Sequence, residues 1–234
     1  EMFSDEEQED SQEKDKHKPN SPAQDQVNIE TLMRSPIVRI DNLSRKRSGK
    51  ALFSNDQLKA VASSLENNSI TFSLTLAFCS LDGEAIDSIG KALITNKTLK
   101  TLNLWGNKMK GMPGSETLAG VLGVGISHNS ALTALSLRGN HVGPDGAVGL
   151  AKGVMNHPRI KTLNLRYCEI ADYGAKSLAM VLLNNPTITH LDLSRNKISF
   201  DGAELLMKSL WLNTSLTELN LQMNPIKDKG GVAV

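Results

Sequence analysis

Five side chains of the types that dominate protein–protein contacts, and one aspartate beside them, occur at matching places in a repeated pattern. Each lies between or just after regularly spaced leucines, so the six would sit side by side if the repeats stack. Tryptophan, tyrosine and arginine are enriched among residues whose truncation weakens protein–protein binding. The sequence therefore predicts a partner-binding surface made of Trp105, Arg138, Arg166, Tyr167, Asp192 and Arg195. The alternative is that the two rings pack on neighbouring side chains and the arginines only favour solubility.

No motif in the sequence indicates a catalysed reaction. The sequence contains no metal-ligand spacing, nucleophile elbow, phosphate-binding loop or paired carboxylate site. Gly106, Gly139 and Gly143 do not form a phosphate-binding fingerprint. His190 is expected to be a solvated strand residue, and the other histidines fall at different loop edges or near the N-terminus. The sequence thus predicts no catalytic residue, no cofactor and no metal, and a protein that is not an enzyme.

The elements that would position the six side chains come from an internal repeat. Five stretches follow Leu-x-x-Leu-x-Leu-x-x-(Asn/Cys)-x-(Ile/Leu/Val/Met), and an imperfect copy precedes them. The third leucines are residues 76, 104, 137, 165, 193 and 221, so the steps are 28, 33, 28, 28 and 28. Apolar residues four apart then follow in each unit, for example Leu178 and Leu182, as expected of an amphipathic helix. Each unit is predicted to be strand, turn, helix and loop, with successive strands parallel.

This arrangement predicts a curved stack. Neighbouring strands lie about 4.8 Å apart, whereas helices with their side chains need about 10 Å. The stack must bend, with the sheet inside and the helices outside. Side chains alternate along a strand, so the residues between and after the leucines face the concave side, where the six predicted contact residues lie.

The Asn/Cys position marks the end of each strand. A buried side chain there is expected to bond backbone groups of the turn that would otherwise be unpaired. Cysteines occupy it at Cys79 and Cys168, three units apart and roughly 14 Å from one another, too far for a disulfide. Two buried free thiols indicate a reducing compartment.

The chain divides into three predicted parts. Residues 1–30 read as a disordered acidic and polar tail, residues 31–70 as an N-terminal capping strand and helix, and residues 71–234 as about six repeats. The last repeat is incomplete, as expected of a fragment of a longer protein. Capping is expected because a terminal unit of a solenoid has one face unstacked.

Two units deviate from the pattern. In the first repeat Ile70 and Leu74 are four apart, which predicts a bulge or a late strand start. The second has five extra residues, and its helix is expected to end near Gly123 or Gly125 and to be followed by a longer loop.

Composition limits the classes of partner. The chain has 234 residues, a formal net charge of +1 and 4% aromatic residues, so nucleic acid is not an expected partner. No run of 18 apolar residues is present, so no membrane span is predicted.

Over about residues 51–234 the chain resembles the ribonuclease-inhibitor class of leucine-rich repeat proteins. The resemblance rests on Leu-x-x-Leu-x-Leu-x-x-Asn-x-Ile-x-x-x-Gly, most clearly on Leu-Asp-Leu-Ser-Arg-Asn-Lys-Ile at 191–198. It implies an α/β leucine-rich repeat solenoid, a horseshoe with a concave parallel β-sheet and convex helices. Relatives of this class include ribonuclease inhibitor, the Ran GTPase-activating protein, tropomodulin-like actin caps and the sensor halves of NOD-like receptors.

The resemblance implies protein binding on the concave face and does not choose a partner. The first hypothesis is an interaction module or scaffold within a larger cytoplasmic assembly, with cytoskeletal and ciliary scaffolds as special cases. The alternatives are a GTPase-activating regulator resembling the Ran activator and the sensor half of a NOD-like receptor.

Overall fold

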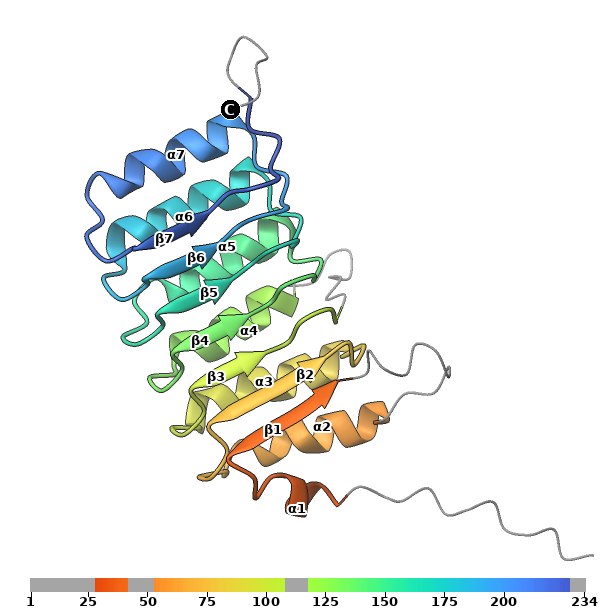
Figure 1. Ribbon diagram of the computed structural model, residues 1–234. Helices are drawn as coiled ribbons and strands as arrows, with labels where there is room; N and C mark the ends of the chain where they lie inside the picture. Colours follow the sequence, from red (N-terminus) through yellow and green to blue (C-terminus); the bar gives the residue numbers. More distant parts are fainter. Residues whose placement is uncertain (1–27, 42–52, 108–117, 228–234) are drawn as a thin grey trace, which may run out of the picture.

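The computed structural model describes residues 28–41, 53–107 and 118–227. Within these ranges the strands form one parallel sheet in chain order, with the helices packed along its other side (Figure 1). The strands are β1 (Ile37–Asp41), β2 (Ser73–Ala77), β3 (Thr101–Asn103), β4 (Ala134–Ser136), β5 (Thr162–Asn164), β6 (His190–Asp192) and β7 (Glu218–Asn220). The helices are α1 (Ile29–Leu32), α2 (Asn55–Ser64), α3 (Gly83–Thr95), α4 (Leu118–Ser127), α5 (Gly143–Val154), α6 (Asp172–Asn184) and α7 (Phe200–Leu210).

The register of the sheet follows the leucine repeat. Leu102 on β3 pairs with Leu135 on β4, and Leu135 pairs with Leu163 on β5. The third leucines are also neighbours, because the backbone amide of Leu104 donates to Ser136 and that of Leu137 to Asn164. The predicted α/β leucine-rich repeat solenoid with parallel strands is therefore confirmed. We call its strand-lined side the concave face.

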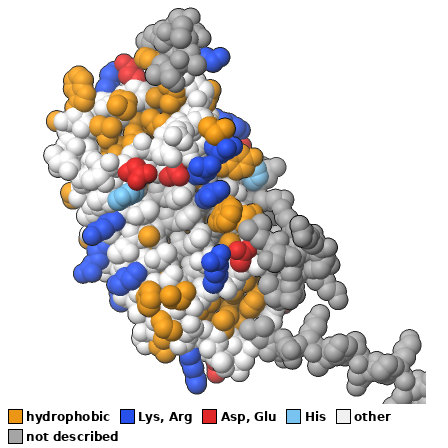
Figure 2. Space-filling model, in the orientation of Figure 1, with side chains coloured by type: hydrophobic (Ala, Val, Ile, Leu, Met, Phe, Trp, Pro, Cys, Tyr) orange, Lys and Arg blue, Asp and Glu red, His pale blue; other side chains and the backbone are white. Residues whose placement is uncertain are grey.

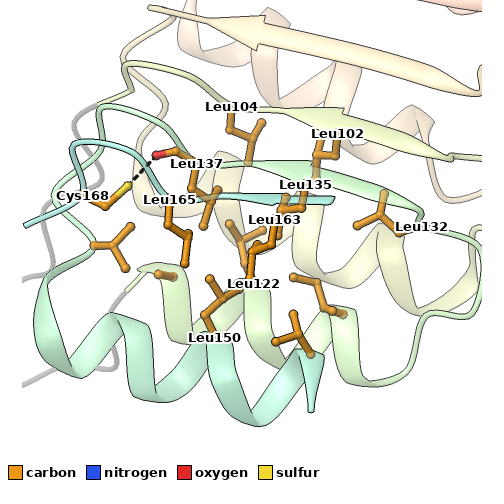
Figure 3. Packing of buried hydrophobic residues seen from close by; sticks show 14 of the residues in the cluster. Leu102, Leu104, Leu122, Leu132, Leu135, Leu137, Leu150, Leu163, Leu165 and Cys168 are labelled. Atoms are coloured by element: carbon orange, nitrogen blue, oxygen red, sulfur yellow. Dashed lines mark hydrogen bonds between the residues drawn. The ribbon is translucent and has the colours of Figure 1, made fainter. Parts of the chain in front are cut away.

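Leucine stacking also makes the core. Leu104, Leu137 and Leu165 come from three consecutive units and lie one beside the next between the sheet and the helices (Figure 3). Leu122 of α4 and Leu150 of α5 close the same interior from the helical side, and all five side chains are fully buried. One continuous aliphatic core therefore fixes the concave face as a rigid wall.

The irregular first repeat contains neither a bulge nor a late strand start, because β2 begins at Ser73, opposite the first residue of β3, so that expectation was wrong. β2 pairs with β1 in unbroken register from Ser73 to Ala77. Thr71, three residues before Leu74, occupies the place of the first leucine and is fully buried, whereas Ile70 is exposed. The Thr71 hydroxyl lies 2.8 Å from the carbonyl of Ser35 and 3.2 Å from that of Met33, so its burial is compensated.

Helix α4 continues through Gly123 and Gly125 to Ser127, which corrects the predicted helix end. Both glycines are places where backbones meet: a Cβ on Gly125 would lie 2.9 Å from the Gly90 Cα of α3, and one on Gly123 would meet Gly149 of α5. The five extra residues precede this helix. Asn107 and Leu118 are eleven apart, whereas Asn140 and Gly146 at equivalent places are six apart. Most of that stretch lies outside the described residues.

We expect Gly153→Ala to lower the free energy of unfolding by about 3 kcal/mol, because overpacking forces the backbones apart. The new Cβ would lie 2.7 Å from the Gly123 Cα, between two helices that cannot separate without disturbing the core. Urea unfolding followed by circular dichroism measures the change.

The matched control is Gly90→Ala, also in a helix facing its neighbour. Its Cβ would lie 3.3 Å from the nearest atom, the Val121 carbonyl oxygen. Alanine is the better helix former by about 1 kcal/mol, so this variant should lose less than about 1 kcal/mol. Equal losses in the two variants would contradict the close-packing explanation.

Asparagines at the strand ends form a first ladder through the core, as predicted. The Asn196 amide group donates to the carbonyls of Leu165 and Leu193, and its oxygen accepts the amides of Cys168 and Ile170. Each such side chain ties its own turn to the turn of the preceding unit. Cys168 takes the same place and its thiol donates to the Leu137 carbonyl at 3.1 Å (Figure 3).

A second ladder lies at the other edge, where each helix is followed by the next strand. The Asn129 oxygen accepts the amides of Ala131 and Leu132, while its nitrogen donates to the carbonyls of Leu93 and Asn96. The same position holds Asn68, Asn96, Asn129, His157, Asn185 and Asn213. This ladder joins consecutive loops as the first joins consecutive turns.

The N-terminal elements α1, β1 and α2 lie at the first end of the stack (Figure 1). Ser54 forms a capping box with Gln57 at the start of α2. The predicted tail boundary at residue 30 falls inside α1, and residues 1–27 lie outside the described part of the chain. Among the described residues, no helix is long and apolar enough to cross a membrane.

Candidate protein-docking face

The predicted contact residues lie where the strands end, and backbone hydrogen bonds continue beyond the strands to align them. The Gly106 amide donates to the Arg138 carbonyl at 2.9 Å, and the Gly139 amide to the Arg166 carbonyl at 2.9 Å. The residues after the last leucine thus form one row across the sheet. This row consists of Trp105, Arg138, Arg166, Ser194 and Gln222.

At one end of the row three side chains stack. The Phe78 and Trp105 ring centroids are 4.6 Å apart in an edge-to-face arrangement. The Arg138 guanidinium carbon lies 4.6 Å from the centroid of the Trp105 ring, a cation–π contact. Gly106 leaves room for this stack, because a Cβ there would lie 2.5 Å from the nearest atom of the Phe78 ring. Arg138 is therefore held in place before any partner arrives.

In the middle of the row Arg166 is held by a polar relay. Its Nη1 donates to the Ser194 hydroxyl oxygen at 3.4 Å, and that hydroxyl donates to Asp192 Oδ1 at 2.6 Å. Ser194 is only 1% exposed, so it cannot contact a partner itself. The contact predicted for Asp192 stays a prediction, and the structure shows that one of its oxygens accepts the hydroxyl that holds Arg166.

Asp192 has a second local role that the sequence analysis missed. Its Oδ1 accepts the Ser194 backbone amide at 2.9 Å, and the same bond, from the residue two positions on, is made by Asn103, Asn164 and Asn220. These Asx turns end each strand and turn the chain into the row. The signal was present in the sequence as an Asn or Asp between the last two leucines of four units.

Tyr167 and Arg195 lie in the next row, beside the first. Tyr167 is 65% exposed, so of the two predicted aromatic residues only Trp105 packs on neighbours. Both residues have left-handed backbone, with φ of 55° and 56°. Glycine occupies the equivalent positions 106 and 139. Phe78 and Met223 at the same position also have positive φ, of 54° and 58°, so the left-handed backbone belongs to the repeated turn and does not single out these two residues.

The charged side chains of the face are mainly basic. In Figure 2, which has the orientation of Figure 1, Lys and Arg side chains recur along it and acidic groups interrupt them at few places. Within the described ranges no carboxylate lies within 4.0 Å of the Arg138, Arg166 or Arg195 guanidinium. On β7 Glu218 faces His190, with 3.8 Å between the carboxylate and Nε2.

A separate charged cluster lies on the turns at the edge of the face. Glu169 contacts His141 and accepts from Lys197 at 2.8 Å. The Lys197 bond, followed by the His141 bond, lowers the pKa of the Glu169 carboxyl. All three side chains are partly or fully exposed, so the cluster ties adjacent turns together without enclosing a reaction site.

The remaining reactive groups are buried or dispersed. Burial raises the pKa of the Cys79 and Cys168 thiols to about 12, so neither is a nucleophile at neutral pH. Both are free cysteines. In the part of the chain that the structure describes, no three His, Cys, Asp or Glu side chains gather as a metal ion would require.

An apolar groove of about 200 Å³ lies between α6 and α7 on the helical side, lined in part by Met180, Leu183 and Leu205. Trp211, 88% exposed, follows α7. The sequence analysis did not single out this surface. α7 is the last helix described, and nothing in the structure shows what covers the groove.

A family model of the leucine-rich repeat matches four stretches of the chain. Residues 128–151, 157–179, 184–207 and 212–234 match the Leucine Rich repeat family model. A search of the curated proteins finds no match. Among solved structures, the chain is similar to leiomodin-1 actin-binding site 2, at 16% identity over 66% of this chain and 88% of that chain, with a TM-score of 0.48. It is also similar to an internalin from Listeria monocytogenes, at 14% identity over 86% of this chain and 85% of that chain, with a TM-score of 0.22.

Four stretches match the repeat model by sequence, and the parallel strands with alternating helices extend the same unit on the N-terminal side. Together they show that the fold is an α/β leucine-rich repeat solenoid.

Proposed function

We propose that this protein is a non-enzymatic docking module, and that its concave face binds an acidic or mixed protein surface within a larger cytoplasmic assembly. The observation that supports this is the pair of pre-positioned arginines, Arg138 on the Trp105 ring and Arg166 on the Ser194 hydroxyl. Ordering a free arginine on binding costs about 0.5–1.5 kcal/mol. Arginines held in advance avoid much of this cost, which favours a recognition role over one in solubility.

Within the proposal the six predicted residues divide by role. Arg138, Arg166, Tyr167 and Arg195 contact the partner, while Trp105 and Asp192 hold two of the arginines. The 28-residue unit with a full helix favours the ribonuclease-inhibitor type of repeat. A cytoskeletal or ciliary scaffold is the special case in which the partner belongs to those structures.

The test is quantitative capture from cell extract with tagged baits. We expect Arg138→Ala combined with Arg166→Ala to reduce recovery of the specific partner at least about tenfold, because truncated hot-spot residues each cost about 2 kcal/mol or more. Mass spectrometry compares the recovered proteins with those on the wild-type bait.

Lys152→Ala combined with Lys176→Ala is the control. It removes the same charge from exposed positions on α5 and α6. If wild type and both variants recover the same proteins in equal amounts, the partner does not dock on the concave face. If only the lysine variant loses the partner, the partner docks on the helices.

A further inference from the structure

The charges of the concave face have a counterpart at the start of the same chain. Arg138, Arg166 and Arg195 have no carboxylate partner in the described ranges. Residues 1–13 contain seven carboxylates and no basic residue. Their acidic members are Glu1, Asp5, Glu6, Glu7, Glu9, Asp10 and Glu13.

We infer that residues 1–13 bind the arginines of the concave face in the same molecule, and so compete with the partner for that surface. The contact is electrostatic, between carboxylates and guanidinium groups, with Phe3 beside the acidic run available to the exposed Tyr167 ring. This inference rests on the face proposed above as the docking surface.

The connecting chain is long enough for this contact. Residue 28 caps α1, beside β1 at the first end of the stack. Arg138 follows β4 and Arg195 follows β6, which are three and five strand spacings from β1, or about 14 and 24 Å. The fourteen residues 14–27 reach about 46 Å when extended, and about 20 Å on average as a flexible chain.

Because residues 1–13 are tethered to the repeats, even a weak contact with the concave face is formed in a substantial fraction of molecules. A segment joined by a linker whose typical length matches the span has an effective concentration in the millimolar range. The held geometry of Arg138 and Arg166 distinguishes the concave face from the other basic run of the sequence, Arg45, Lys46, Arg47 and Lys50, whose placement lies outside the described residues. Binding of residues 1–13 to the concave face and binding to residues 45–50 predict opposite results when the three arginines are replaced.

The test uses the full chain with Trp211→Phe, which leaves Trp105, beneath Arg138, as the one remaining tryptophan. Acrylamide quenching of its fluorescence reports how accessible the row is. A second protein has the seven carboxylates of residues 1–13 changed to Asn and Gln. At low salt we expect the quenching constant of the neutralised protein to be about twice that of the protein with unchanged residues 1–13. Adding about 0.5 M NaCl should raise the quenching constant about twofold in the protein with unchanged residues 1–13 and leave that of the neutralised protein as it is.

The control background adds Arg138→Gln, Arg166→Gln and Arg195→Gln. Within it, neutralising residues 1–13 should leave the quenching constant unchanged. The inference is overturned if the neutral segment has no effect in the first background, or if its effect persists without the three arginines, as binding to residues 45–50 would produce. Partner capture that depends on the arginines, together with unchanged quenching, would reject the self-contact alone.

Discussion

Replacing Asn196 by alanine should lower the free energy of unfolding by about 4 kcal/mol, the largest loss expected from any single side chain in the turns. Its amide oxygen accepts the buried amides of Cys168 and Ile170, and its nitrogen donates to the carbonyls of Leu165 and Leu193. Removing it leaves four backbone groups without these bonds, and each buried unpaired group costs about 1–3 kcal/mol, partly relieved by entering water. Urea unfolding followed by circular dichroism measures the loss.

Asn164→Ala is the matched control. This asparagine lies one unit away on β5, is half-buried, and its side chain accepts the Arg166 amide at 3.0 Å. Its loss should cost about 1 kcal/mol. Equal losses for the two variants would show that the Asn196 ladder does not hold the turns together.

The second large effect concerns His157, which replaces asparagine in the ladder at the helix ends. Its Nδ1 accepts the backbone amides of Arg159 and Ile160, so the ring proton lies on Nε2. The side chain is 3% exposed, and Nε2 has no hydrogen-bond partner among the described residues. Burial lowers the pKa of His157 from 6.5 to about 4.

Because the pKa of His157 is lower in the folded protein, the unfolded chain binds more protons between pH 6.5 and 4. The free energy of unfolding therefore has its full value above pH 6.5 and decreases as the pH falls from 6.5 to about 4. The lowering of the His157 pKa from 6.5 to about 4 corresponds to about 3 kcal/mol of stability. Urea unfolding at pH 7 and at pH 4.5 should show most of this difference.

His157→Asn should remove this dependence. By the repeat, the new amide would donate to the carbonyls of Ile126 and Asn129, as Asn185 does to those of Val154 and His157. We expect about 1 kcal/mol of added stability at pH 7, since an unpaired buried donor is replaced by a paired one. His128→Asn, at an exposed histidine, should leave the difference between the two pH values almost unchanged. An acid loss of equal size in wild type and His157→Asn would contradict this account.

The sequence predicted the architecture well because the leucine period determines both strand register and core. Its failures were local. A helix-breaking tendency was assigned to Gly123 and Gly125, but these glycines lie where neighbouring helices touch, which only the tertiary packing reveals. Thr71 was missed as a core residue because its burial depends on the carbonyls of Met33 and Ser35, almost forty residues earlier in the chain.

The candidate site was predicted as a set of neighbours, and the structure does bring Trp105, Arg138 and Arg166 together. It could not be predicted which of them hold others in place. Asp192 was predicted as a contact residue from its place between the last two leucines, and its bonds to Ser194 add a local structural role. His157 was read as a loop residue, although its spacing of 28 from both Asn129 and Asn185 marks it as a member of the ladder.

The most direct test of the docking face is arginine-specific dicarbonyl labelling of the protein with the seven carboxylates of residues 1–13 changed to Asn and Gln, free and bound to its captured partner, followed by mass spectrometry. The account predicts that modification of Arg138, Arg166 and Arg195 slows about tenfold in the complex. Arg34, exposed beside α1, serves as the internal reference and should react at the same rate in both states. Unchanged labelling of the three arginines in a saturated complex would contradict the account.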